Sequence, residues 1–213
     1  MSKKKDKKSH QKNPSFERSR ISKQGNIRLI GGDWRGRNLP VLHSEGLRPT
    51  SDRVRETLFN WLQFKIAGAN CLDVFAGSGA LGLEALSRGA KKAIFLELSV
   101  PAARQLQNNL DMLKTMNAQV IQGDSLLWLE RGGGENFDMV FVDPPFHQGL
   151  MQKTVDKLFT TGTLSNEVTE PSSWLYLEQE RELAWPKLPE GWSCYREKKT
   201  SQVRFGLFRK EGE

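Results

Sequence analysis

The 213-residue sequence contains only two cysteines and three histidines. Cys71 and Cys194 are far apart and have no metal-ligand spacing, so neither a disulfide framework nor a metal site is expected. No apolar run approaches the roughly 18 residues of a membrane span. The lysine-rich start also has no apolar segment behind it that would make a signal peptide. These absences favour a cytoplasmic protein without a membrane partner.

Charge is distributed unevenly along the chain. Residues 1–28 contain ten Lys or Arg and two acids, a surplus of +8, whereas the whole chain carries +7, so the remaining residues sum to −1. Residues 1–24 are polar and are predicted to form a disordered basic arm. The arm indicates either an anionic partner, with nucleic acid the first candidate, or a solvated tail that aids solubility. The remaining length, 25–213, suits one domain.

The order of sequence patterns indicates an α/β fold. Residues 25–45 contain two short strand patterns around the turn GGDWRGR, which predicts a β-hairpin appendage. A helix is predicted over 48–66, with Thr50 or Ser51 as its N-cap, because apolar residues follow at helical spacing. Residues 70–213 alternate between strand and helix patterns, which is typical of a parallel sheet with helices on both faces. The last two strand patterns have no full helix between them, so we expect the sheet to finish with an antiparallel hairpin.

The first chemical motif is DVFAGSGALG, which gives Gly77, Gly79 and Gly82 a G-x-G-x-x-G spacing, with Glu97 at the end of the next predicted strand. This spacing is typical of a dinucleotide site, where glycines permit close backbone approach and the carboxylate accepts from ribose hydroxyls. Asp73 argues against a pyrophosphate, because its charge would lie near the helix N-terminus that a phosphate needs. A ligand that carries an ammonium and a sulfonium, such as S-adenosylmethionine, would instead be attracted.

The end of the third predicted strand has the sequence GDSLL. The Asp124 carboxylate can accept a hydrogen bond from an adenine amine, and Leu126 or Leu127 can pack on the ring. For Ser125, both a cofactor contact and a role as helix N-cap remain open. We interpret Asp124 as a cofactor residue because its strand end faces the same crevice as the two preceding ones.

The second chemical motif is the DPPF stretch that follows a hydrophobic strand pattern. Pro144 and Pro145 end the strand and fix the backbone. The Asp143 carboxylate and the Pro144 carbonyl can accept the two N–H bonds of an exocyclic base amine and so direct its lone pair at a methyl group. Phe146 offers a face on which the base can stack. The candidate catalytic residues are therefore Asp143, Pro144, Pro145 and Phe146.

Together, these motifs resemble class I S-adenosylmethionine-dependent methyltransferases that act on amines, which are marked by [DNS]-PP-[YFW]. More narrowly, IRLIGGDWRGRNLP, LRPTSDRVRETLFNWL, LDVFAGSGALGLEALSRGA and VFVDPPF are similar to the bacterial 16S ribosomal RNA (guanine-N2)-methyltransferases. The similarity covers about residues 26–209. It implies a Rossmann-like, seven-stranded, mostly parallel sheet with an antiparallel last strand. It also implies methyl transfer to the N2 amine of one guanine of 16S rRNA, in the 30S subunit or an assembly intermediate.

The resemblance and the motifs also define the expected site residues. The expected cofactor residues are Asp73, Phe75, Gly77, Gly79, Glu97, Asp124, Ser125 and Leu126. Related enzymes imply that Arg48 to Glu56 close over the methionine end of the cofactor. The arginines that cluster before the sheet are predicted to hold RNA phosphates: Arg28, Arg35, Arg37, Arg48, Arg53 and Arg55.

Several alternatives remain open from the sequence. The Asp143 geometry also suits an adenine or cytosine amine of DNA or RNA, although guanine presents N1–H and N2–H side by side, which a carboxylate can accept together. An RNA-binding ribosome assembly factor with the same fold would need no catalysis. A nicotinamide oxidoreductase is the last alternative, which Asp73 disfavours. We expect a monomer.

Overall fold

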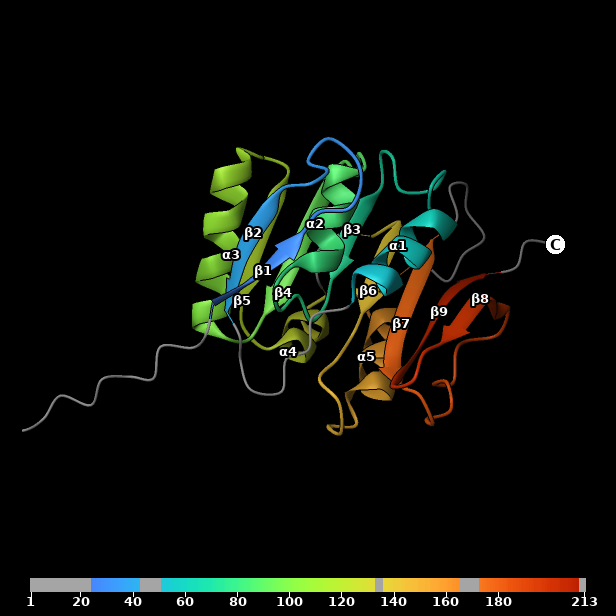
Figure 1. Ribbon diagram of the computed structural model, residues 1–213. Coiled ribbons are helices and arrows are strands. Elements are labelled where there is room, and N and C mark those ends of the chain that lie inside the picture. The colour runs from blue at the N-terminus through green and yellow to red at the C-terminus, as the bar shows by residue number, and fades with distance from the viewer. Residues whose placement is uncertain (1–23, 43–50, 133–135, 165–172, 211–213) are drawn as a thin grey trace, which may run out of the picture.

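The computed structural model describes residues 24–42, 51–132, 136–164 and 173–210 (Figure 1). The chain first forms a hairpin and a helix and then a larger sheet with its helices. The strands are β1 Gln24–Arg28, β2 Asn38–Leu42, β3 Asn70–Asp73, β4 Lys92–Glu97, β5 Ala118–Gln122, β6 Met139–Val142, β7 Trp174–Glu180, β8 Trp192–Lys199 and β9 Val203–Lys210. The helices are α1 Asp52–Trp61, α2 Ala80–Ser87, α3 Val100–Leu113, α4 Ser125–Glu130 and α5 Leu150–Thr160.

The large sheet has seven strands in the order β5-β4-β3-β6-β7-β9-β8. Strands β3 to β7 pair in parallel, whereas β9 runs antiparallel to both of its neighbours, β7 and β8. The chain places β4 and β5 on one side of β3 and β6 and β7 on the other. Open α/β sheets bind ligands at the point where the strand order reverses in this way, beyond the carboxyl ends of the strands. The sequence prediction of a mostly parallel sheet with an antiparallel last strand is confirmed, and that last strand lies inside the sheet, not at its edge.

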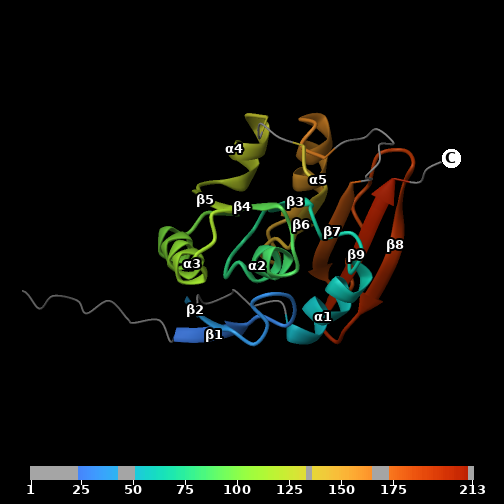
Figure 2. The same ribbon diagram turned by 90° about the horizontal axis from the view of Figure 1, so that it is seen from above.

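Helices cover both faces of the sheet, as Figure 2 shows. Helices α4 and α5 pack on one face, and α1, α2 and α3 lie on the other with the β1–β2 hairpin outside them. Two apolar cores match these layers, one that contains residues of the hairpin, α1, α2 and α3, and one that contains residues of α4 and α5. Alternating side chains of one strand therefore point into different cores: Tyr176 into the first and Leu177 into the second.

The predicted hairpin is confirmed, with β1 and β2 antiparallel. The helix predicted over 48–66 is shorter than expected, because α1 begins after its N-cap Ser51, whose hydroxyl accepts from the N–H of Val54, and ends at Trp61. A turn then follows, and it allows Leu62 and Ile66 to enter the core. Residues 43–50, which include the start of the predicted helix, lie outside the described residues.

Within the described ranges, none of the helices has the length and apolar character that crossing a membrane requires.

Candidate functional site

A cavity of about 470 Å³ opens at the carboxyl ends of the central strands. Asp73 at the end of β3 and Asp143 just after β6 both line it. The two strands are parallel neighbours in which Asp73 pairs with Phe141, so Asp143 lies two residues beyond that pair on the same face of the sheet. Both sequence motifs, the glycine loop and DPPF, therefore open onto one cavity.

Asp73 is 3% exposed, and its carboxylate accepts a hydrogen bond from the N–H of Gly82 at 3.1 Å. The pKa of Asp73 is raised to about 7, mainly by burial and to a smaller extent by the charge of Glu97, against the opposing effect of the Gly82 hydrogen bond. Gly82 belongs to the first turn of α2, so the carboxylate already satisfies an amide that a bound phosphate would require. The arrangement suits a positively charged ligand group better than a pyrophosphate.

The glycine loop depends on glycine at two positions. Gly79 has a φ of +76° at the N-cap of α2, and a Cβ there would lie 2.4 Å from Cδ1 of Leu106. A Cβ on Gly82 would lie 2.3 Å from the ring of Phe95 on β4. A side chain at Gly79 would have to displace Leu106 of α3, and one at Gly82 would have to displace the Phe95 ring, so at Gly82 the helix packs closely on the sheet, as the G-x-G-x-x-G spacing predicts.

Glu97 braces the glycine loop from the neighbouring strand. Its two carboxylate oxygens accept from the backbone N–H groups of Gly77 and Ser99, each at 2.7 Å. Gly77 and Phe75 line the cavity, but neither Glu97 nor Gly79 is among its described lining residues. The ribose contact expected of Glu97 stays a prediction, and the structure adds a positioning role for this carboxylate.

The structure excludes one of the two roles that the sequence leaves open for Ser125 in the GDSLL segment. Asp124, not Ser125, is the N-cap of α4, and it accepts from the N–H of Leu127 at 3.0 Å. The N-cap role for Ser125 is therefore wrong. Its hydroxyl is buried and donates to the carbonyl of Val74 at 2.6 Å, which ties α4 to β3. Asp124, Ser125 and Leu126 are not among the described cavity-lining residues, so their adenine contacts stay predictions.

The DPPF segment lines the same cavity as the glycine loop and follows the strand next to β3. Pro144 is buried, and Phe146 is partly buried against the core beneath α1 and α2. The next residue, His147, has a φ of +63°, an uncommon conformation for a residue with a side chain. Its N–H donates to Glu180 of β7 at 2.7 Å. The segment is thus fixed at both ends, as its two prolines predict.

Two groups of cavity residues at the C-terminal strands were not predicted from the sequence. Glu178 of β7 is buried yet lines the cavity beside Asp143, and it accepts from the Tyr176 hydroxyl at 2.7 Å. The end of β8 and the turn that follows it also line the cavity, through Lys198, Lys199, Thr200, Ser201 and Gln202. The adjacency of Glu178 and Asp143 follows from the pairing of β6 with β7, in which Val142 pairs with Leu177, and this register was not evident from the sequence.

The predicted RNA-binding arginines fall into different environments. Arg53 is exposed and lines the cavity. The prediction that Arg55 holds an RNA phosphate is wrong, because its side chain is only 1% exposed beneath the hairpin. Arg28, Arg35 and Arg37 are exposed on the hairpin, away from the described cavity lining. Arg48 lies outside the described residues.

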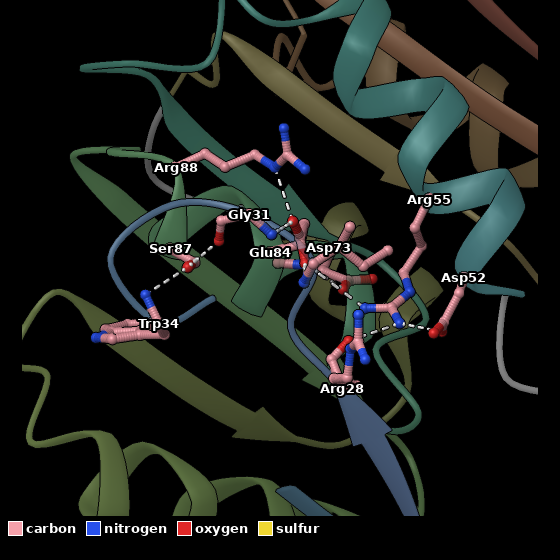
Figure 3. Close-up of polar contacts among 11 residues, drawn as sticks. Arg28, Gly31, Trp34, Asp52, Arg55, Asp73, Glu84, Ser87 and Arg88 are labelled. Atoms are coloured by element: carbon pink, nitrogen blue, oxygen red, sulfur yellow. Dashed lines mark hydrogen bonds and ion pairs between the residues drawn. The ribbon is translucent and has the colours of Figure 1, made fainter. Parts of the chain in front are cut away.

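Arg55 belongs to a polar network that joins the hairpin to α1 and α2 (Figure 3). Its guanidinium donates to the Arg28 carbonyl at 2.9 Å and to Asp52 at 2.6 Å, and it lies 3.7 Å from the buried carboxylate of Glu84. Glu84 also accepts from the N–H groups of Ile30 and Gly31. The network therefore fixes the hairpin against the helix that follows the glycine loop.

Among the residues that the structure describes, no group of three or more His, Cys, Asp or Glu side chains could hold a metal ion. The cavity lining combines the carboxylates of Asp73, Asp143 and Glu178 with the aromatic rings of Phe75, Phe146 and Phe205.

The chain is similar to known proteins over most of its length. The family described as conserved hypothetical protein 95 matches residues 27–209. Ribosomal RNA small subunit methyltransferase D of Escherichia coli is 48% identical over 90% of this chain and 94% of its own length. The protein of the same name from Haemophilus influenzae is 48% identical over 87% of this chain and 94% of its length.

A solved methyltransferase structure from Escherichia coli shares the fold. It has a TM-score of 0.78 and 48% sequence identity, and the match covers 89% of this chain and 100% of that one. A solved methylase structure from Haemophilus influenzae has a TM-score of 0.73 and 43% identity over 87% of this chain. The chain therefore belongs to the family of ribosomal RNA small subunit methyltransferase D, the family also described as conserved hypothetical protein 95.

Proposed function

We propose that this protein transfers the methyl group of S-adenosylmethionine to the exocyclic N2 amine of a guanine in 16S ribosomal RNA, within the 30S subunit or an assembly intermediate. The observation that carries the proposal is the single cavity that Asp73 and the DPPF segment share. Family membership supports rRNA of the small subunit as the substrate.

The cavity fits S-adenosylmethionine better than a dinucleotide. The buried Asp73 carboxylate accepts from Gly82 and so leaves negative charge where a pyrophosphate would need bare amides. The same charge attracts the ammonium and sulfonium groups of the cofactor. Gly77 and Phe75 line the cavity beside Asp73, and Glu97 holds the loop that contains Gly77. When bound, S-adenosylmethionine supplies an electrophilic methyl group on its sulfonium.

The DPPF segment would hold the target amine. The lone pair of an exocyclic amine is delocalised into the base, so the enzyme must orient it. The Asp143 carboxylate and the Pro144 carbonyl can accept its two N–H bonds, and the Asp143 charge stabilises positive charge that develops on nitrogen. Phe146 can stack on the base, which is worth about 1–3 kcal/mol in single-stranded recognition. Orientation of this kind can contribute about 7–11 kcal/mol to the barrier reduction.

The RNA must present an unstacked base to so enclosed a pocket, at a cost of a few kcal/mol that is smallest in a loop. Cationic side chains from two separate elements line the cavity, Arg53 on α1 and Lys198 and Lys199 at the end of β8. These charges can contact the phosphates that flank an extruded nucleotide, which gives salt-dependent affinity. The hairpin arginines and the basic arm can extend this contact along the RNA.

The test is methyl transfer from labelled S-adenosylmethionine to 30S particles and to naked 16S RNA, both from cells that lack this protein. Nucleoside digestion should yield N2-methylguanosine at one mapped position. Asp143→Asn should reduce transfer by at least about 100-fold while cofactor affinity is kept. Asp156→Asn is the control, because Asp156 is exposed on α5, which covers the face of the sheet opposite to α1, α2 and α3 (Figure 2). N6-methyladenosine as the product would refute the guanine assignment, and full cellular function of an inactive variant would favour an assembly factor.

A further inference from the structure

Three carboxylates lie in a row at the carboxyl ends of neighbouring strands. Asp73 ends β3, Asp143 follows β6, and Glu178 lies near the end of β7. Strand β6 pairs with β7 in parallel up to Val142 and Leu177, so Asp143 and Glu178 are the next residues in register. Neighbouring strands are about 4.8 Å apart. Glu178 therefore flanks Asp143 on the side away from Asp73, and all three line the same cavity.

The burial of the Glu178 carboxylate is unfavourable for the stability of the fold. Glu178 is 5% exposed on a central strand, whose other residues are mostly apolar and buried. Burial of a carboxylate is unfavourable unless hydrogen bonds compensate for lost water. Tyr176, two residues earlier on the same face, donates to Glu178 at 2.7 Å. A hydrophobic side chain of similar size at this position would stabilise the fold more than a buried carboxylate does. The position of the carboxylate at the cavity therefore points to a role in binding a ligand there.

Tyr176 maintains Glu178 as a hydrogen-bond acceptor. Burial raises the pKa of the Tyr176 phenol well above its usual range, and the charges of Glu178 and Asp143 raise it further. The phenol thus stays protonated and donates a hydrogen bond to the carboxylate. Both carboxylates lie close enough to affect the same hydroxyl group, which agrees with their adjacent positions in the sheet.

The bases that carry an exocyclic amine differ at the ring atom beside it. Guanine has a donor, N1–H, next to its N2 amine, whereas adenine and cytosine have an unprotonated ring nitrogen that can only accept. If Asp143 and the Pro144 carbonyl hold the amine, the adjacent ring atom faces the next acceptor along the sheet edge. A carboxylate there attracts N1–H of guanine and repels the ring lone pair of adenine or cytosine.

We propose that Glu178 is the residue that selects guanine, by accepting a hydrogen bond from N1–H of the target base, and that Tyr176 positions it. The inference rests on the proposed function and deepens it, because it assigns base selectivity to a residue outside the DPPF motif. Loss of a hydrogen bond to a charged acceptor in a closed site predicts a change in selectivity of about 10- to 100-fold.

The experiment compares guanine with 2-aminopurine at the mapped target position of otherwise identical 30S particles. 2-Aminopurine keeps the amine at C2 but has an unprotonated N1. The full-length wild-type protein should prefer guanine by kcat/KM. Glu178→Gln, whose amide can donate to an unprotonated N1, should lower the guanine to 2-aminopurine ratio by about 10- to 100-fold. Tyr176→Phe should lower it by a smaller factor, and both variants should bind S-adenosylmethionine as the wild type does.

Glu182→Gln is the matched control, since this carboxylate is 86% exposed and follows the same strand. An unchanged guanine to 2-aminopurine ratio in both Glu178→Gln and Tyr176→Phe would overturn the inference. An equal loss of transfer to the two bases leaves that ratio unchanged and would indicate a general electrostatic role for Glu178. Absence of guanine methylation by the wild-type protein would instead contradict the proposed function itself. The measured ratio does not depend on the fraction of folded protein, so partial misfolding of a variant does not obscure it.

Discussion

Glu180, the last residue of β7, accepts a hydrogen bond from the backbone N–H of His147 at 2.7 Å, and its carboxylate lies 3.4 Å from Nδ1 of the same residue. His147 directly follows the DPPF segment and has a φ of +63°. This conformation is unfavourable for a residue other than glycine, so it persists only where surrounding contacts hold it. Glu180 is therefore the residue that fixes the C-terminal side of the candidate amine-binding segment.

Glu180→Ala should loosen the DPPF segment without disturbing the glycine loop. We expect kcat to fall about 10- to 100-fold, because small displacements of a positioning group reduce rates by such factors. The dissociation constant of S-adenosylmethionine should stay within about twofold. Methyl-transfer kinetics and calorimetry on the same preparation test this. Glu182→Ala serves as the exposed control, and a wild-type kcat for Glu180→Ala would contradict the positioning role.

The buried pair of Arg55 and Glu84 predicts a large loss of stability. Glu84→Leu removes the carboxylate that faces Arg55, binds Arg88 at 2.7 Å and accepts from two hairpin amides. Because Arg55 would remain buried and lose the buried carboxylate opposite it, keeping Asp52 and the Arg28 carbonyl as partners, the free energy of unfolding should fall by about 3–5 kcal/mol. Arg53→Met on the same helix should change it by less than about 0.5 kcal/mol. Urea denaturation measures both, and equal midpoints would argue against the network.

Arg53 and Arg55 show which features of the site cannot be predicted from the sequence. Both follow the N-cap of α1 and look alike as charges before the sheet. Arg55, however, precedes Leu58 by three positions and Leu62 by seven, so it lies on the buried stripe of the helix. Helical spacing alone could have found this. The partners that make burial tolerable come from β1 and α2, which no local pattern reveals.

The order of strands and helices was predictable because each element has a strong periodicity and the turns contain glycine or proline. The shared cavity of Asp73 and Asp143 was also predictable, since the carboxyl ends of parallel strands meet at one edge. Glu178 was not found because β7 is buried on both faces, so its side chains show no alternation that would distinguish a cavity residue. The β8–β9 turn was missed because its approach to the cavity depends on the long-range pairing of β9 with β7.

Gly82 provides a test of close helix-sheet packing. A Cβ at this position would lie 2.3 Å from Cε1 of Phe95, so Gly82→Ala must displace the ring. The free energy of unfolding should fall by about 1–3 kcal/mol, the usual cost of an overpacked core. Combination with Phe95→Leu should restore part of the loss, because the two substitutions share one contact. Strict additivity in a double-mutant cycle would show that the predicted contact is not the cause.

Asp73 also predicts how stability depends on pH. Its pKa in the folded protein is raised from 3.8 to about 7, so between these values the folded protein binds more protons than the unfolded chain. The stabilisation that the protonated form provides is thus present at low pH and is lost as pH rises through 7. Asp73→Asn removes this dependence. The free energy of unfolding of the variant minus that of the wild type should therefore increase from pH 4 to pH 7 and level off above about 8.

The same carboxylate predicts proton release when S-adenosylmethionine binds. A cationic ligand beside Asp73 favours its ionised form, so binding must lower the pKa of Asp73 and release a proton near neutral pH. Affinity should then rise as pH increases from 6 to 8. Calorimetry at pH 7 in two buffers of different ionisation enthalpy counts the released protons, and Asp73→Asn should release fewer. Equal proton release by the two proteins would show that the cation lies elsewhere, and that the carboxylate of β3 does not receive the positive end of the cofactor.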